Sequence, residues 1–466
     1  MKKLVSRFMA VLMAMTMILS MSMTAFAAEA PKGTLTVNNT VAEKTLDLYQ
    51  IFTAIKSGEN VAYTLNSAYE GFFQNKITGA SKLTGEALSE KAYAYVKEQV
   101  GDDGSKGATF AKDILGWILS ASGETKTAVE STHSTADTAD TKTVIDNLVY
   151  GYYVVYPLGA TDTSTAPGNE TVKSVTSLVN VTDTTVTINM KSNYPTVVKK
   201  VNDKNADDVN IGDTVTYTLT SKVPDMTGYT SYVFNFKDTL AKGLTFGSIT
   251  SVKIGDVTIN ADTDGTKAEN TYTLTTKNNE DGTTEIKIEM NKFLASNANK
   301  AGQEIKVTYT ATLNKDAVTG FDPNTNKATV EYSNKPGTNE KGESEPSIVD
   351  VHTFDFTIFK YYLKDETQTA LANAEFELYK ANTAGNAADT DAKINIVDEG
   401  KGVYRQATAD EAKVTGFTSA KIVSDDDGKV LVKGLEAGTY YLRETKAPEG
   451  YNKLLSDIKV EIKPVY

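Results

Sequence analysis

Three features of the sequence predict a mainly β protein. Stretches in which apolar and polar residues alternate recur along the chain, as on strands with one buried face. Glycine-containing turns separate many of these stretches, and the composition is rich in threonine, valine and tyrosine, which favour strands. Helical periodicity is found in the first third of the chain. We therefore expect tandem immunoglobulin-like β-sandwiches in a rod, with helical insertions in the N-terminal domain.

Residues 1–27 have the pattern of a secretory signal peptide. Basic residues precede an apolar run at 8–18, and small residues at Ala25 and Ala27 suit a signal peptidase, which would cut between Ala27 and Ala28. A retained membrane anchor is the alternative, but the apolar run is short for a membrane span. We expect the mature protein to work outside the cell. It has no cysteine, so no disulfide can reinforce it there.

The composition excludes several classes of function. The net charge of −12 argues against a nucleic-acid partner. With two histidines and no cysteine, the chain offers little for a metal site or for histidine-based catalysis, so we expect no metal and no cofactor. No second apolar run is long enough to cross a bilayer, so we expect no membrane contact in the mature form.

The patterning divides the mature chain into three domains. The first, 28–194, begins and ends with alternating strands at 34–37 and 184–188, and has amphipathic helices at 87–100 and 108–119. The second, 195–348, is almost purely β, with alternating strands at 214–220, 285–289 and 305–311. The third, 349–466, also has the strand pattern of a compact sandwich, which is C-terminally incomplete.

Three polar residues of the second domain lie on apolar strand faces. Because strand side chains alternate, Lys199 shares a face with Val197 and Val201, whereas Lys200 lies on the other face. Asn326 is on the apolar face of the expected last strand, and Asp238 is on that of another.

These three groups could react. Burial lowers the pKa of a lysine and raises that of an aspartic acid, so both could be neutral. The Lys199 amine could then attack the Asn326 side-chain carbonyl while Asp238 polarises it, and ammonia would leave behind an amide bond. Alternatively, Lys199 reaches solvent while Asn326 and Asp238 lie at turns. The pattern alone favours this second interpretation, because lysines on strands are usually solvated.

The mature chain resembles the major (backbone or shaft) pilins of Gram-positive sortase-assembled pili. The third domain is similar to collagen-adhesin B-type sandwiches, and the second to the isopeptide-forming domain of fimbrial shaft subunits. The first is similar to the N-terminal domain of those subunits. The matching stretches are 44–52 in the first domain, 197–201, 211–217, 238–244 and 326–334 in the second, and 356–360, 374–379 and 434–451 in the third.

The resemblance implies site residues. It favours an isopeptide bond between Lys199 and Asn326, with Asp238 as the catalytic acid. In the third domain it implies Lys360 as the crosslinking lysine and Glu444 as the acid, but after Glu444 only Asn452 is available, close to a turn. We therefore expect Lys360 and Glu444 to be unreacted. The first domain has asparagines at 38 and 39 where crosslinked relatives have lysine, and Lys44 with Asn180 is a substitute pair that nothing specific supports.

The resemblance also implies assembly. Shaft pilins carry a lysine near the first domain boundary that accepts the next subunit, and Lys191 is the corresponding residue in an altered motif. The LPxTG-type sorting signal of such pilins is not found before Tyr466, so we expect either a truncated product or a protein that sortase does not process.

We expect a structural, non-enzymatic pilus subunit on the cell wall, with other pilin subunits and host or bacterial surface ligands as partners. The alternative is a monomeric surface adhesin whose sandwiches form a stalk and whose N-terminal domain binds a ligand.

Overall fold

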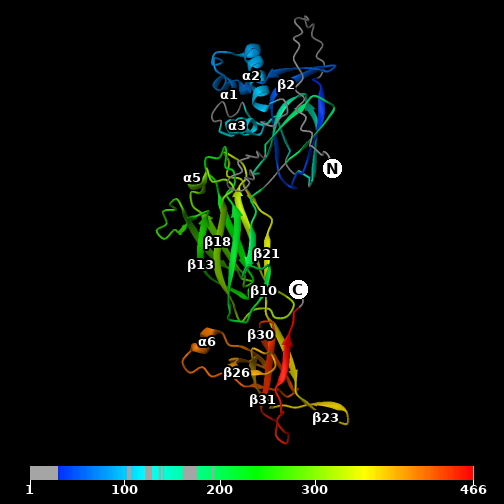
Figure 1. The fold of residues 1–466 in the computed structure, drawn as a ribbon, viewed down its shortest axis with the longest axis vertical. Coiled ribbons are helices and arrows are strands. Elements are labelled where there is room, and N and C mark those ends of the chain that lie inside the picture. Colours follow the sequence, from blue (N-terminus) through cyan, green and yellow to red (C-terminus); the bar gives the residue numbers. More distant parts are fainter. Residues whose placement is uncertain are drawn as a thin grey trace.

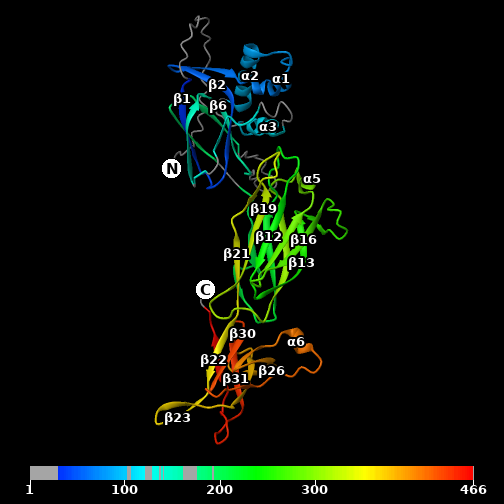
Figure 2. The same cartoon turned by 180° about the vertical axis from the view of Figure 1, so that it is seen from behind.

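The computed structural model describes residues 30–101, 107–120, 129–135, 138–139, 141–160, 176–190 and 194–464. Three bodies follow one another along one long axis, in the order of the sequence (Figures 1 and 2). We call them the first domain (β1–β8 with α1–α3), the middle domain (β9–β21 with α5) and the third domain (β22–β32 with α6). Strands dominate each body, and the long helices belong to the first. The predicted fold class is therefore confirmed.

The first domain is built from two sheets and a helical layer. Its elements are β1 (Lys32–Asn38), β2 (Leu46–Ser57), β3 (Asn60–Leu65), a 3-10 turn (Ser67–Tyr69), α1 (Glu70–Lys76), α2 (Gly85–Val100), α3 (Gly107–Ser120), β4 (His133–Thr135), β5 (Lys142–Val149), β6 (Gly151–Pro157), β7 (Ser177–Val181) and β8 (Thr185–Asn189). The sheets have the orders β5-β1-β8 and β3-β2-β6-β7, and β4 also pairs with β2.

The side chains of β2 and β6 explain this layering. In β6, Tyr152 and Val154 belong to the apolar core shared with the helices, whereas Tyr153 and Val155 belong to the core shared with the smaller sheet. Successive side chains of a strand point to opposite faces, so this sheet is buried on both sides. Trp117 of α3 contacts Phe72 at a ring-centroid distance of 5.7 Å, as expected of a residue that packs the helical layer.

The middle domain is a sandwich of two sheets around one apolar core. Its elements are β9 (Val198–Val201), β10 (Ala206–Asp208), β11 (Thr214–Lys222), β12 (Phe234–Leu240), β13 (Leu244–Ile254), β14 (Val257–Thr258), β15 (Asn260–Ala261), β16 (Thr271–Asn278), β17 (Thr284–Met290), α5 (Phe293–Asn297), β18 (Glu304–Leu313), β19 (Asn324–Ser333), β20 (Lys341–Glu343) and β21 (Ser347–His352). One sheet has the order β14-β13-β18-β11-β9, and the other β10-β21-β19-β12-β17-β16-β15, with β20 beside β19.

Two further strands follow the strand of Asn326 in this domain. We expected the strand of Asn326 to be the last and drew the boundary after residue 348. In the structure β19 is followed by β20 and β21, and β21 pairs with β19 across that boundary. Residues 334–347 are polar and contain glycine and proline, and this composition hides the short strand β20 and the start of β21.

The third domain is a smaller sandwich with a projecting hairpin. Its elements are β22 (Phe354–Phe359), β23 (Tyr361–Lys364), β24 (Thr367–Ala370), β25 (Glu375–Ala381), β26 (Ala388–Lys393), β27 (Ile396–Gly400), β28 (Val403–Gln406), α6 (Ala409–Lys413), β29 (Ile422–Val423), β30 (Lys429–Leu435), β31 (Gly438–Lys446) and β32 (Ile458–Ile462). The sheets are β22-β30-β28-β27 and β26-β25-β31-β32, with β29 on β25. The hairpin β23-β24 projects near the end farthest from the middle domain (Figure 1).

Hydrogen bonds from backbone amides join the middle and third domains closely. Only Thr353 separates β21 from β22. The turn between β30 and β31 contacts the segment before β11: Ile211 N–H donates to Gly434 O at 3.0 Å, and Ala437 N–H donates to Asp208 Oδ2 at 2.7 Å. A Cβ on Gly434, whose φ is +83°, would lie 2.6 Å from the Ile211 side chain. This contact therefore requires glycine.

Candidate functional site

Lys199 lies inside the middle domain, at the edge of one sheet. It is in β9, which pairs with β11 so that Lys199 is opposite Leu219. Its neighbours Val197 and Val201 also face the core, while Val198 is exposed, so the strand alternates as its sequence predicted. Only 1% of Lys199 is accessible to solvent. Lys200 faces the other way and donates to Asn205 Oδ1 at 2.6 Å. Of the two lysines, Lys199 is the buried one.

Asp238 and Asn326 reach the same place from the opposite sheet. Asp238 is in β12, opposite Ala328 of β19, and Asn326 is in β19, opposite Leu240 of β12. Both side chains are buried, Asn326 completely. The adjacent antiparallel strands β12 and β19 therefore hold the two groups on one inward face. The structure brings Asp238 to Lys199, whose ammonium Nζ donates to Asp238 Oδ2.

Tyr309 links the three predicted residues. It lies in β18, in the same sheet as Lys199, and is completely buried. Its hydroxyl accepts from Lys199 Nζ at 2.7 Å and from Asn326 Nδ2 at 2.7 Å, and donates to Asp238 Oδ2 at 2.8 Å. One donor and two acceptor positions are thus all used. We call Lys199, Asp238, Asn326 and Tyr309 the buried cluster.

Tyr309 was not among the residues predicted from the sequence, although a signal for it is present. The strand at 305–311 alternates, and Tyr309 falls on the same parity as Ile305, Val307 and Ala311. Its ring stacks on Tyr217 at a centroid distance of 5.2 Å, which accounts for an aromatic residue there by packing alone. Only the hydrogen bonds across the two sheets reveal its polar role.

The surroundings of the buried cluster make Lys199 easier to deprotonate. Burial lowers the pKa of Lys199 from 10.5 to about 8, and the attraction of Asp238 opposes only part of this effect. The ammonium also lies 4.8 Å from the centre of the Tyr217 ring and 5.1 Å from that of Tyr309. Aromatic faces attract a cation, but less strongly than water does. A proton can therefore leave this amine more easily than it leaves an exposed lysine.

Two buried oxygens of the cluster lack hydrogen-bond donors. Asp238 Oδ1 and Asn326 Oδ1 are both inaccessible to solvent and have no partner. An unpaired buried acceptor costs about 1–3 kcal/mol. A proton on Asp238 would turn one of these acceptors into a donor. The arrangement therefore holds a potential nucleophile, a potential acid and an amide in one solvent-inaccessible space between two sheets.

The third domain brings its predicted pair together as well. Lys360 Nζ lies 2.8 Å from Glu444 Oε1, and the Glu444 side chain is fully buried. Glu444 Oε2 accepts from the Leu454 amide at 2.7 Å. Asn452 is exposed, and β32, the last described strand, contains neither asparagine nor aspartate. Neither Asn452 nor β32 thus offers Lys360 and Glu444 a carboxamide partner like Asn326.

The remaining predicted residues fall into two groups. Lys191, Ala27 and Ala28 lie outside the described residues. In the first domain, Lys44 lies over the Tyr194 ring, 4.9 Å from its centre. Asn180 is in β7, opposite Tyr152 of β6, and its side-chain oxygen is buried without a partner. None of these interactions joins Lys44 to Asn180.

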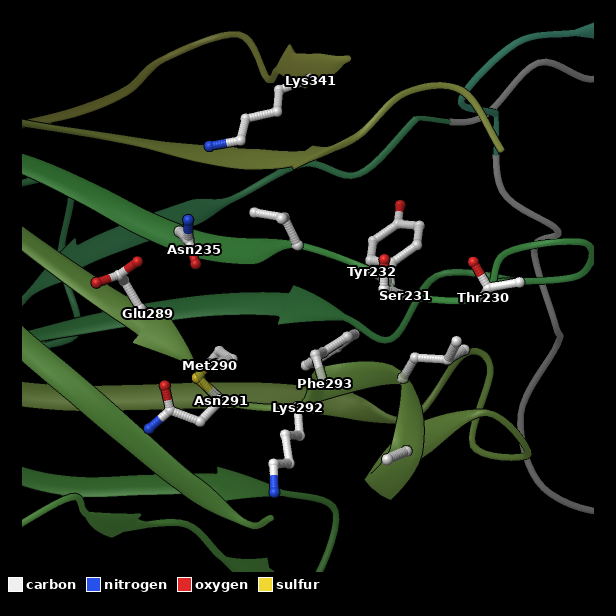
Figure 3. A pocket seen from close by; sticks show the side chains of 13 residues that line it. Thr230, Ser231, Tyr232, Asn235, Glu289, Met290, Asn291, Lys292, Phe293 and Lys341 are labelled. Carbon is white, nitrogen blue, oxygen red and sulfur yellow. The ribbon is translucent and has the colours of Figure 1, made fainter. Parts of the chain in front are cut away.

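A shallow hollow of about 460 Å³ opens beside α5 in the middle domain (Figure 3). Tyr232 and Phe293 contribute aromatic surface to it, and Lys292 and Lys341 lie on opposite sides. None of the predicted site residues lines it. Among the described residues, no group of three or more histidine or acidic side chains could hold a metal ion. No helix in the described ranges combines the length and apolarity needed to cross a membrane.

Comparisons with known proteins point to pili. Residues 211–336 match the family model "Gram-positive pilin backbone subunit 2, Cna-B-like domain", and residues 359–465 match the model "SpaA: Prealbumin-like fold domain". The trypsin-resistant surface T6 protein of Streptococcus pyogenes serotype M6 is 26% identical over 277 residues, which cover 56% of this chain. The match spans 44% of that relative, less than half of its length.

Several solved structures are similar over most of the chain. The T6 backbone pilin of Streptococcus pyogenes serotype M6 is 17% identical, with a TM-score of 0.48 and coverage of 93% of this chain and 80% of that one. The full-length major pilin SpaD from Corynebacterium diphtheriae is 19% identical, with a TM-score of 0.46 and coverage of 93% and 91%. The major pilin SpaA from the same organism is 16% identical, with a TM-score of 0.48 and coverage of 92% and 95%.

Proposed function

Because this chain carries a Gram-positive pilin backbone domain followed by a SpaA prealbumin-like domain, we propose that it is the structural shaft subunit of a covalent, sortase-assembled pilus. Its work is mechanical and supports adhesion, outside the cell and attached to the cell wall. It is not an enzyme in the sense of turnover. The single chemical event is the formation of an intramolecular amide bond between Lys199 and Asn326.

The buried cluster supports this bond. In the reactive state the proton of the Lys199–Asp238 pair resides on Asp238, so Lys199 is a neutral amine. The amine attacks Cγ of Asn326, and Asp238 hydrogen-bonds Asn326 Oδ1 and stabilises the negative charge that develops there. The Nζ–Cγ bond forms, the Cγ–Nδ2 bond breaks and ammonia leaves. Folding supplies the proximity, so no cofactor is needed.

The position of the bond fits a load-bearing subunit. Lys199 is in the first strand of one sheet and Asn326 is in the other sheet, so the bond ties the sheets together. A pilus under tension pulls each subunit between its acceptor lysine and its C-terminal end. With Lys191 as acceptor, force enters the middle domain just before β9. A covalent tie from β9 to β19 lets this force bypass the hydrogen bonds of the sheets.

Intact mass tests the crosslink. The purified mature protein should be lighter than its sequence mass by one ammonia molecule. Lys199→Ala and Asp238→Ala should each restore the mass expected from their sequences, whereas Lys200→Ala, the matched control on the exposed face, should still show the loss. A full sequence mass for the unmutated protein would exclude the crosslink.

Gel electrophoresis tests the assembly. The complete gene, expressed in its host with the pilus sortase, should give a ladder of high-mass species that survives boiling in detergent. Lys191→Ala should abolish the ladder, and Lys200→Ala should leave it intact. A single band from the unmutated gene would instead support a monomeric adhesin with a β-sandwich stalk.

A further inference from the structure

We propose that Tyr309 is a catalytic residue of the crosslinking reaction, in which its hydroxyl relays a proton from Lys199 to the departing nitrogen of Asn326. The inference rests on the proposed Lys199–Asn326 bond. The supporting observation is the position of the Tyr309 hydroxyl. It contacts both Lys199 Nζ and Asn326 Nδ2, the two nitrogens that replace one another on Cγ of Asn326.

The reaction requires a proton to move between those nitrogens. When Nζ bonds to Cγ, it must lose one proton to become an amide nitrogen. When Nδ2 departs, it must gain one proton to leave as ammonia. Asp238 contacts Nζ through Oδ2, but Nδ2 donates to Tyr309 and not to either oxygen of Asp238. The reaction therefore needs a group between Nζ and Nδ2 that accepts a proton from the first nitrogen and donates one to the second.

The Tyr309 hydroxyl has this geometry. Lys199 Nζ lies 2.7 Å from its oxygen and already donates to it. Asn326 Nδ2 also lies 2.7 Å from that oxygen. Before attack, the amide nitrogen is conjugated with its carbonyl and cannot accept a proton. Once Cγ becomes tetrahedral, the lone pair of Nδ2 is free. The Tyr309 hydrogen points to Asp238 Oδ2 in the described state, and it can turn toward Nδ2 once Asp238 carries its own proton.

The balance is complete without an outside reagent. The Nζ proton passes to the Tyr309 oxygen while the Tyr309 proton passes to Nδ2. Tyrosine is unchanged, the Nζ–Cγ bond replaces the Cγ–Nδ2 bond, and ammonia is released. Asp238 keeps its proton and can hold the carbonyl oxygen throughout. The cluster is inaccessible to solvent, and the Tyr309 hydroxyl is the member of the cluster that contacts both Nζ and Nδ2.

Tyr217 offers a matched control. It is the stacked neighbour of Tyr309, is equally buried, and also lies beside the Lys199 ammonium. Its hydroxyl, however, makes no hydrogen bond of normal geometry, although it lies near enough to the Asn326 side chain to interact with it. Tyr309→Phe and Tyr217→Phe thus remove the same atom from neighbouring positions. Only the first removes a hydroxyl that hydrogen-bonds both Lys199 Nζ and Asn326 Nδ2.

The experiment follows the mass of the mature chain with time. Unreacted chain, collected from inclusion bodies in urea, is diluted into refolding buffer and sampled by mass spectrometry. Tyr217→Phe should lose ammonia at the unmutated rate, and Tyr309→Phe roughly 100-fold more slowly, as for other general acid–base groups. Equal rates for Tyr309→Phe and the unmutated protein would overturn the relay while leaving the crosslink standing. No ammonia loss from the unmutated protein would overturn the crosslink itself.

A second measurement covers the case in which Tyr309→Phe does not fold. The unmutated chain is refolded in mixtures of light and heavy water. Because the relay moves two protons together, the rate should fall along a curve as the deuterium fraction rises. A straight line, which indicates one moving proton, would overturn the relay.

Discussion

Replacing Asn326 by alanine should remove the crosslink and leave the Lys199–Asp238 ion pair in place. The bond closes a loop of 127 positions (326 − 199). Treated as a crosslink that restricts the unfolded chain, a loop of this length contributes about 5 kcal/mol to the free energy of unfolding. For a domain of this size, the loss corresponds to a melting temperature lower by about 10–20 °C.

The crosslink can be separated from the cost of deleting side chains. Lys199→Met, Asn326→Ala and the double variant form a cycle with the unmutated protein, and the free energy of unfolding is measured for each. Each single variant loses the whole bond, so the double variant loses it only once. It should therefore be about 5 kcal/mol more stable than the sum of the two single losses implies.

Additive losses of stability in this cycle would show that Lys199 and Asn326 are not crosslinked. If the two losses add within about 0.5 kcal/mol, no covalent or strong direct coupling joins the two residues. A matched pair of variants outside the cluster, Lys200→Met with Asn314→Ala, should show such additivity, because both side chains lie on the outer surface.

Three further predictions follow from the described geometry. The rate of crosslinking on refolding should be constant from about pH 6 to 7.5 and fall roughly tenfold per pH unit above pH 8. The pKa of Lys199 is about 8, and above this pH the Lys199–Asp238 pair has lost the proton that Asp238 needs. A rate that rises above pH 8 would contradict this prediction. Lys360→Met should change the mass of the chain only by the difference between the two side chains. In the unmutated protein, trypsin should cut the third domain before the middle one. Equal resistance of the two domains to trypsin would show that Lys360 has found a crosslinking partner. Gly434→Val should weaken the contact between the third and middle domains by about 2 kcal/mol or more, since a side chain at positive φ would strike Ile211. Small-angle scattering should then detect a less extended molecule. Gly450→Val, at a turn with open space, should leave the scattering unchanged.

The fold class and the inward face of Lys199 could be predicted because both depend on local alternation. In β9 the apolar neighbours of Lys199 indicate which side chains face inward, and the same side chains face inward in the structure. The assignment of β19 as the last strand failed because β20 and β21 are short or polar at their start, and only pairing with β19 makes them strands.

The role of Tyr309 could not be predicted for a different reason. Its contacts join β18 to strands of the opposite sheet, and no local pattern records which inward side chains meet across a sandwich. The same holds for Gly434. Its stretch, 434–451, is one of those that carry the family resemblance, but only the structure shows that the start of this stretch contacts the middle domain.

That contact limits how such a protein can change during evolution. The turn of the third domain at 434–437 is held by backbone and side-chain groups of Asp208, Asn210 and Ile211. A third domain taken from a relative would bring its own turn to a surface shaped for this one. The two domains should therefore be inherited as a pair, and chimaeras should succeed only when residues 208–211 are exchanged together with the domain that contacts them.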